Sequence, residues 1–168
     1  MEEISASNRR VRVLLIFFMA ALVVSGLTAI PLKREIEIIN ELAGPGSWLG
    51  ASLPALALWL GFLREGLTDA YGRYPFLAYG TDWLAFGHLV IALAFIGPLR
   101  DPRGNIWVIE FGMIACLLII PWTLIFGALR AIPPFWRLID MSFGLFGMIP
   151  LWLAYREIRY FQLKYDKS

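Results

Sequence analysis

The chain has one cysteine, Cys116, and one histidine, His88, among its 168 residues. A single cysteine forms no intrachain disulfide and cannot make a paired-cysteine metal or redox site. A single histidine cannot supply both axial ligands of a bis-histidine haem. The sequence also contains no phosphate-binding loop, dinucleotide-binding fingerprint, zinc-protease helix or nucleophile elbow. We therefore expect no cofactor and no metal, and the sequence assigns no catalytic residue.

Charge is scarce as well. Only 17% of the residues are charged, and the formal net charge is +2. The basic residues stand at the ends of apolar segments, so they do not form the continuous basic surface that binds nucleic acid. We expect the lipid bilayer, and no nucleic acid, as a partner.

What the sequence has in abundance is apolar residues, 59% of the chain, gathered into four long runs. A helix needs about 17 to 25 residues to cross a hydrocarbon core roughly 30 Å thick. The four runs have that length, so we expect an all-α integral membrane protein, a single membrane domain over residues 1–168. The predicted transmembrane helices are residues 13–31, 83–99, 106–129 and 138–155.

Two segments between the first and second of these helices are less apolar or shorter. In residues 32–47, charged residues alternate with isoleucine and leucine before Gly44, Pro45 and Gly46, which predicts a short helix lying in the membrane interface. Residues 48–63 are apolar but few, and they contain Pro54. They form a fifth span, a re-entrant segment or a second interfacial helix.

The distribution of basic residues favours four spans over five. With five spans, lysine and arginine divide almost evenly between the two sides, whereas with four they are more frequent on the side of both termini. Cytoplasmic loops are the ones enriched in lysine and arginine. We therefore expect a cytoplasmic amino terminus.

Two short connections join the last three predicted spans. The first, residues 98–105, contains two prolines, a glycine and an Asp-Pro pair, and the second, residues 131–136, contains Pro133 and Pro134. Such residues favour turns and prevent a continuous helix. The last three spans are therefore predicted to run up, down and up as antiparallel neighbours.

Ionisable residues inside apolar helices are costly and are therefore candidates for function. His88 follows Trp83 by five residues and Asp140 follows Trp136 by four, so the two lie at similar depth on parallel helices. Ala85 and Ala92 flank the histidine, and Gly144 lies one turn beyond the aspartate, which predicts faces suited to close packing. We expect a His88–Asp140 hydrogen bond. The polar cluster candidates are His88, Asp140, Asp82 and Glu110.

Glu110 has two interpretations. It lies near the membrane surface, where Arg100 and Arg103 of the preceding turn would neutralise it. Alternatively, it forms a proton path together with His88 and Asp140, although the residues between them are almost entirely apolar.

An aromatic segment precedes Asp82. Tyr71, Tyr74 and Tyr79 lie among glycines and a proline, so they are interfacial anchors or a cap over a ligand such as a lipid headgroup or a quinone ring.

Two stretches carry a resemblance: YPFLAYGTDWLAFGHLVIALAFIGPLRDPRGNIWVIEFGMI and IPPFWRLIDMSFG. They resemble a group of uncharacterised small bacterial inner-membrane proteins over residues 74–155, a resemblance that implies a bacterial inner (cytoplasmic) membrane and no particular activity. In size, helix content and tryptophan number the chain is also similar to the tryptophan-rich sensory protein and translocator family. The helix signatures of that family are not found here, so neither its topology nor its ligand sites are carried over.

Three functions remain open at this stage. The first is a non-catalytic accessory or scaffold subunit that contacts another membrane protein or a second copy of the chain. The second is a small-molecule or proton carrier that uses His88, Asp140 and Glu110. The third is an intramembrane enzyme acting on a lipid or quinone, with His88 as general base oriented by Asp140.

Overall fold

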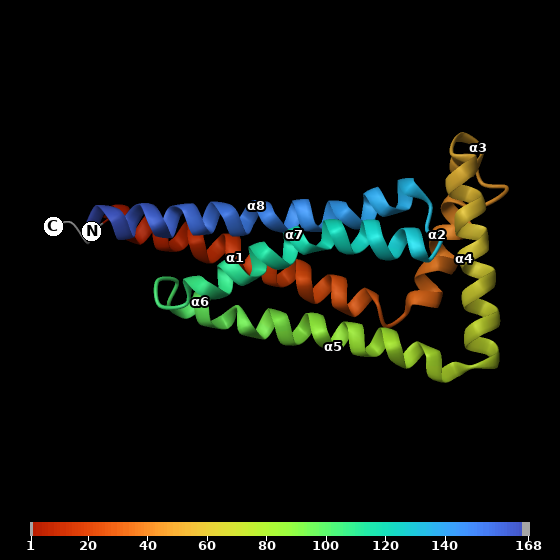
Figure 1. Ribbon diagram of the computed structural model, residues 1–168, viewed down its shortest axis with the longest axis horizontal. Helices are drawn as coiled ribbons and strands as arrows, with labels where there is room; N and C mark the ends of the chain where they lie inside the picture. Colours follow the sequence, from red (N-terminus) through yellow and green to blue (C-terminus); the bar gives the residue numbers. More distant parts are fainter. Residues whose placement is uncertain (1, 166–168) are drawn as a thin grey trace. The chain divides into compact units, whose positions relative to one another are not determined.

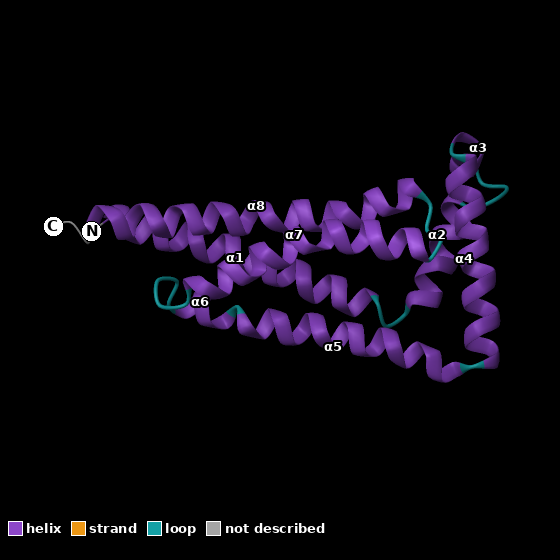
Figure 2. Ribbon diagram, in the orientation of Figure 1, coloured by secondary structure: helices purple, strands orange, loops and turns teal. Residues whose placement is uncertain are grey.

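The structure is a computed structural model that describes the backbone of residues 2–165 and the side chains of residues 9–164. All of the regular secondary structure in these residues is helical (Figure 2). The prediction of an all-α protein is confirmed. Four helical segments in the described part are long and apolar enough to cross a membrane: Arg9–Thr28, Pro75–Arg100, Ile106–Leu129 and Pro134–Lys164.

The chain divides into two compact units. Unit 1 consists of Met1–Ala21 and Ile91–Ser168, and unit 2 consists of Leu22–Val90. Each is described by itself below.

Unit 1 is built on a hairpin of two long antiparallel helices, α7 (Ile106–Leu129) and α8 (Pro134–Tyr165) (Figure 1). Small residues bring the two backbones together. A Cβ atom at Gly144 would lie 2.5 Å from the carbonyl oxygen of Cys116, and a Cβ atom at Gly147 would lie 3.0 Å from its Sγ atom. Close contact between small residues is how helices associate in lipid, where burying apolar surface gives little driving force.

The first part of α1 (Glu2–Thr28) packs on this hairpin through one side. Val11, Leu15 and Phe18 are buried and follow one another at helical spacing. The ring of Phe18 lies 4.8 Å from that of Phe95, which precedes the short helix α6 (Ile96–Arg100). Phe95 in turn lies against Gly112 of α7.

The two predicted connections in unit 1 are indeed short turns. In the first, the Asp101 carboxylate accepts a hydrogen bond from the backbone N–H of Gly104, at 3.1 Å. In the second, Ala131 takes a positive φ of 54°, and Pro134 begins α8. Arg137 stabilises this second turn because its Nε donates to the carbonyl oxygen of Ile132, at 2.9 Å.

Unit 2 contains the end of α1 and then α2 (Leu32–Ala43), α3 (Trp48–Ser52), α4 (Pro54–Arg73), the 3-10 helix η1 (Pro75–Ala78) and most of α5 (Tyr79–Ala94). Helices α2 and α4 pack together, and Ile36, Ala57 and Leu60 are buried there. Within this unit α4 runs crosswise to α5 (Figure 1). Helix α4 includes residues 54–63 of the segment left open by the sequence, and it is not among the candidate spans.

The ends of three helices differ from those of the apolar runs. Helix α1 stops at Thr28, whereas α5 begins at Tyr79 and α8 continues to Tyr165. Hydropathy detects the apolar part of a helix, but the backbone hydrogen bonds continue into polar sequence. Helix α7 has the same bounds as its predicted span.

Candidate functional site

His88 lies on α5 in unit 2 and is half-buried. Its Nδ1 atom is 2.8 Å from the carbonyl oxygen of Leu84, one turn earlier on the same helix. A carbonyl oxygen only accepts hydrogen bonds, so Nδ1 is a protonated nitrogen that donates to it. The side of α5 around His88 faces the end of α1, because a Cβ at Gly26 would lie 2.7 Å from the Cβ of His88 and 3.1 Å from the carbonyl oxygen of Ala85.

Asp140 is half-buried on α8 in unit 1. The small-residue strip that follows it, Gly144 and Gly147, packs on Cys116 of α7. Both helices therefore pack closely, as predicted. The helix that carries Asp140 packs on α7, and the helix that carries His88 packs on the end of α1. His88 and Asp140 belong to different units. The hydrogen bond between them stays a prediction.

Glu110, near the start of α7, forms an ion pair. Its Oε1 atom is 3.3 Å from the Nη2 atom of Arg159, near the end of α8. The same guanidinium donates to the Tyr155 hydroxyl at 3.2 Å and to the Gln162 side chain at 3.4 Å. The expectation of a pair with Arg100 or Arg103 is wrong, because the antiparallel hairpin brings the far end of α8 back to the start of α7.

The remaining sequence candidates lie in unit 2 around the start of α5. Tyr71 is on α4, Tyr74 lies between α4 and η1, and Tyr79 is the first residue of α5. Tyr79 and Asp82 line one shallow pocket of about 210 Å³ together with Trp83 and Phe86. All four residues are exposed on a single helix, and the rings of the three aromatic ones meet edge to face, as in the aromatic belt of a membrane protein.

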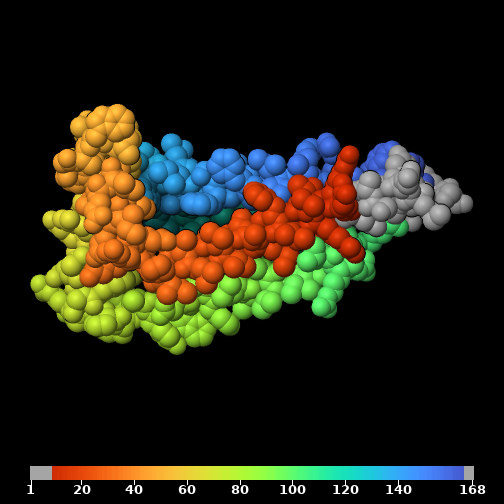
Figure 3. Space-filling view, turned by 180° about the vertical axis from the view of Figure 1, so that it is seen from behind, coloured from red at the N-terminus to blue at the C-terminus, as the bar shows by residue number. Residues whose placement is uncertain are grey.

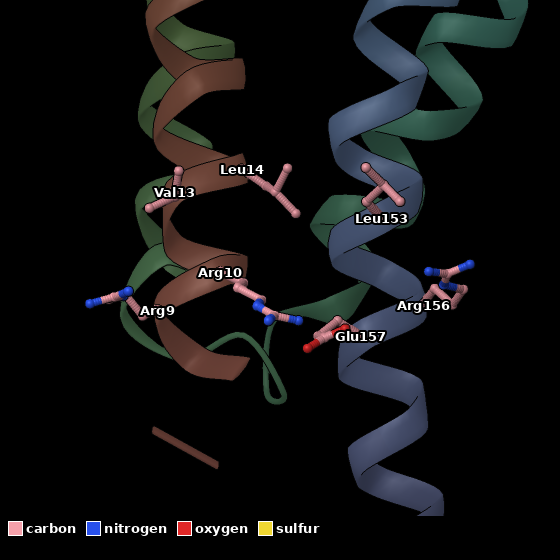
Figure 4. Close-up of a pocket in the computed structure, with 7 residues that line it drawn as sticks. All are labelled: Arg9, Arg10, Val13, Leu14, Leu153, Arg156 and Glu157. Atoms are coloured by element: carbon pink, nitrogen blue, oxygen red, sulfur yellow. The ribbon is translucent and has the colours of Figure 1, made fainter. Parts of the chain in front are cut away.

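A different pocket combines charge with apolar side chains. It has a volume of about 430 Å³ and lies between α1 and α8 in unit 1, where the first described turns of α1 lie beside the last turns of α8 (Figures 3 and 4). We call it the basic pocket. Its lining residues are Arg9, Arg10, Val13, Leu14, Leu153, Arg156 and Glu157.

The charged side chains of the basic pocket point in different directions. Arg10 and Glu157 extend toward one another from the two helices, whereas Arg9 and Arg156 point away from the gap (Figure 4). The guanidinium of Arg156 lies over the Trp152 ring, 4.9 Å from its centroid. Such stacking holds the guanidinium plane and leaves its N–H edges available.

The basic pocket was missed at the sequence level because its arginines were interpreted only as juxtamembrane charges. A signal was nevertheless present. If both termini lie on the same side, the charged turn before the first span and the charged turn after the last span reach the same depth, and Arg9, Arg10, Arg156 and Glu157 then meet.

Comparison of the chain with protein-family models, with curated proteins and with solved structures finds no match.

Proposed function

We propose that this chain is a non-catalytic accessory or scaffold subunit of a membrane assembly, held in the bilayer by four spans. The observation that carries the proposal is that its ionisable side chains bond to groups of the same helix or the same hairpin. His88 bonds to its own helix and Glu110 pairs with Arg159 at the rim of the α7–α8 hairpin. Both are contacts by which a membrane helix satisfies a polar group, and neither requires a substrate.

The packing of unit 1 supports the same proposal. Glycines at three positions of the hairpin bring α7 and α8 into close contact: Gly112, Gly144 and Gly147. The opposite side of α7 exposes large apolar residues along its length: Trp107, Phe111, Ile114, Leu118, Trp122 and Ile125. A helix hydrophobic on its outer side as well is suited to lipid or to a neighbouring transmembrane helix.

The orientation follows from charge. One end of unit 1 carries the start of α1, the turn before α7 and the end of α8 (Figure 1). Its described basic residues are Arg9, Arg10, Arg12, Arg100, Arg103, Arg156, Arg159 and Lys164, whereas the opposite end has Arg130 and Arg137. The enrichment of basic residues on the cytoplasmic side favours cytoplasmic termini, in a bacterial inner membrane if the resemblance to such proteins holds.

Helix α4 fits this topology as an interfacial helix. If α1 and α5 cross the bilayer, the crosswise direction of α4 within unit 2 supports a position along the membrane surface. Pro54 begins α4, and its later turns carry Arg64, Asp69 and Arg73, whose charged groups suit an interface.

The proposal is tested by extracting the tagged chain from its own membranes into polymer-bounded lipid discs without detergent. Native mass spectrometry then gives the composition of each particle. We expect the 19.0 kDa chain in a fixed ratio with a second membrane protein or a second copy, and the same particle for His88→Gln. Recovery of the chain as a lone monomer would contradict the proposal.

A further inference from the structure

The basic pocket changes from charged to apolar along the helix axes. Arg10 and Glu157 lie toward the ends of α1 and α8, while Leu14 and Leu153 each lie about one turn further into the apolar sequence. One turn corresponds to about 5.4 Å of depth. A phospholipid has the same order of groups, with its phosphate at the surface and its acyl chains below.

We propose that the basic pocket binds an anionic phospholipid, with the phosphate near Arg10, whose side chain reaches into the gap, and the start of an acyl chain along Leu14 and Leu153. Guanidinium groups suit phosphate because their planar N–H donors match its oxygens. Basic pockets between transmembrane helices at the cytoplasmic surface are a recurrent form of lipid-headgroup site.

The charge of the pocket favours an anion. Three arginines and one glutamate line it, so cationic groups are in excess around it; of the arginines, Arg10 reaches into the gap, and Arg9 and Arg156 lie at its rim and point outward. Arg10 and Glu157 face one another, but no ion pair within 4.0 Å joins these two described side chains (Figure 4). The one carboxylate of the pocket therefore does not neutralise its cationic groups through a direct ion pair.

The apolar lining distinguishes a lipid from a soluble anion. Val13, Leu14 and Leu153 give inorganic phosphate no favourable contact, whereas an acyl chain packs on them. The volume of about 430 Å³ lies within the range of small-molecule sites and accommodates a headgroup with its adjoining carbons.

The experiment uses the full chain in a mild non-ionic detergent. Native mass spectrometry measures apparent affinity for dioleoylphosphatidylglycerol, which is anionic, and for dioleoylphosphatidylcholine, which has no net charge. Glycerol 1-phosphate is added as a soluble competitor carrying the same phosphate. We expect tighter binding of phosphatidylglycerol than of phosphatidylcholine, and no competition by glycerol 1-phosphate at concentrations equal to that of the lipid.

Variants locate the site. Each arginine near an anionic lipid contributes about fivefold to affinity, so Arg10→Gln should weaken phosphatidylglycerol binding about fivefold. Glu157→Gln removes the opposing charge and should strengthen binding, a gain that misfolding does not produce. Arg12→Gln is the matched control, because Arg12 lies on the same helix, is exposed and does not line the pocket.

Three results would overturn the proposal. Equal affinity for the two lipids would remove the selectivity for an anion. An Arg12→Gln effect as large as that of Arg10→Gln would indicate diffuse attraction to the basic end of the chain. Displacement of phosphatidylglycerol by an equal concentration of glycerol 1-phosphate would indicate a site for soluble anions.

Discussion

Gly144 of α8 lies directly against the backbone of Cys116 in α7, so close that a Cβ atom at Gly144 would be 2.5 Å from the Cys116 carbonyl oxygen. A backbone atom cannot move aside as the end of a flexible side chain can. The absence of a side chain at this position therefore allows the two helices their present separation, and the α7–α8 hairpin depends on it.

Gly144→Ala is expected to destabilise the protein. Overpacking of a close contact costs about 1–3 kcal/mol in the free energy of unfolding. Gly87→Ala on α5 is the matched control, because nothing lies within 4 Å of a Cβ there and alanine favours a helix over glycine by up to about 1 kcal/mol. Unfolding in one detergent, followed by circular dichroism, compares the two. Equal stability of both variants would show that the helices separate without penalty.

The ion pair between Glu110 and Arg159 is expected to align α7 and α8 along their axes and to contribute little to the free energy of unfolding. Both side chains are well exposed, at 39% and 49%, so a neutral Glu110→Gln variant should unfold at the same temperature as the wild type. Arg159→Glu places like charges together and should lower the midpoint, and the double variant with Glu110→Arg should restore it. If the charge-swapped double variant is no more stable than Arg159→Glu alone, the two residues do not interact.

The topology is tested by cysteine labelling in a Cys116→Ser background. With four spans, Tyr71→Cys lies on the side opposite the termini and Arg103→Cys lies on the cytoplasmic side. With five spans and the same amino terminus, both positions are reversed. We expect a membrane-impermeant maleimide added from outside to label Tyr71→Cys and to leave Arg103→Cys unmodified. The opposite pattern would require residues 48–63 to cross the membrane.

The sequence predicted the elements that local chemistry determines. The bounds of α7 and the turn after α6 follow from hydropathy, proline and glycine, and Pro133 and Pro134 marked the break before α8, although the helix begins at Pro134 and not at the predicted residue 138. The partner of Glu110 could not be predicted in this way, because Arg159 is 49 residues away in the chain and reaches Glu110 only through the antiparallel hairpin. The basic pocket was missed for the same reason, since it combines the first turns of α1 with the last turns of α8.

For the candidate polar residues, the sequence predicted their position along a helix but not their contacts. Depth along a helix placed His88 within apolar sequence, but depth does not give the direction of a side chain around the helix axis. The bond from the ring of His88 to Leu84 and the packing of Gly26 beside it depend on that direction. Periodicity in one sequence cannot supply it when nearly all sides of a helix are apolar.

The most direct test of the central claim is proton movement by the purified chain. Histidine is the side chain best suited to exchange protons near neutral pH, and glutamine keeps hydrogen-bonding groups in its place without titrating. Proteoliposomes with an internal pH dye are given an imposed pH gradient, for the wild type, His88→Gln and Asp140→Asn. If the chain is a structural subunit, proton uptake with all three proteins should equal the leak of protein-free liposomes. Wild-type uptake well above that leak, abolished by His88→Gln in a normally folded protein, would contradict the account and identify a carrier.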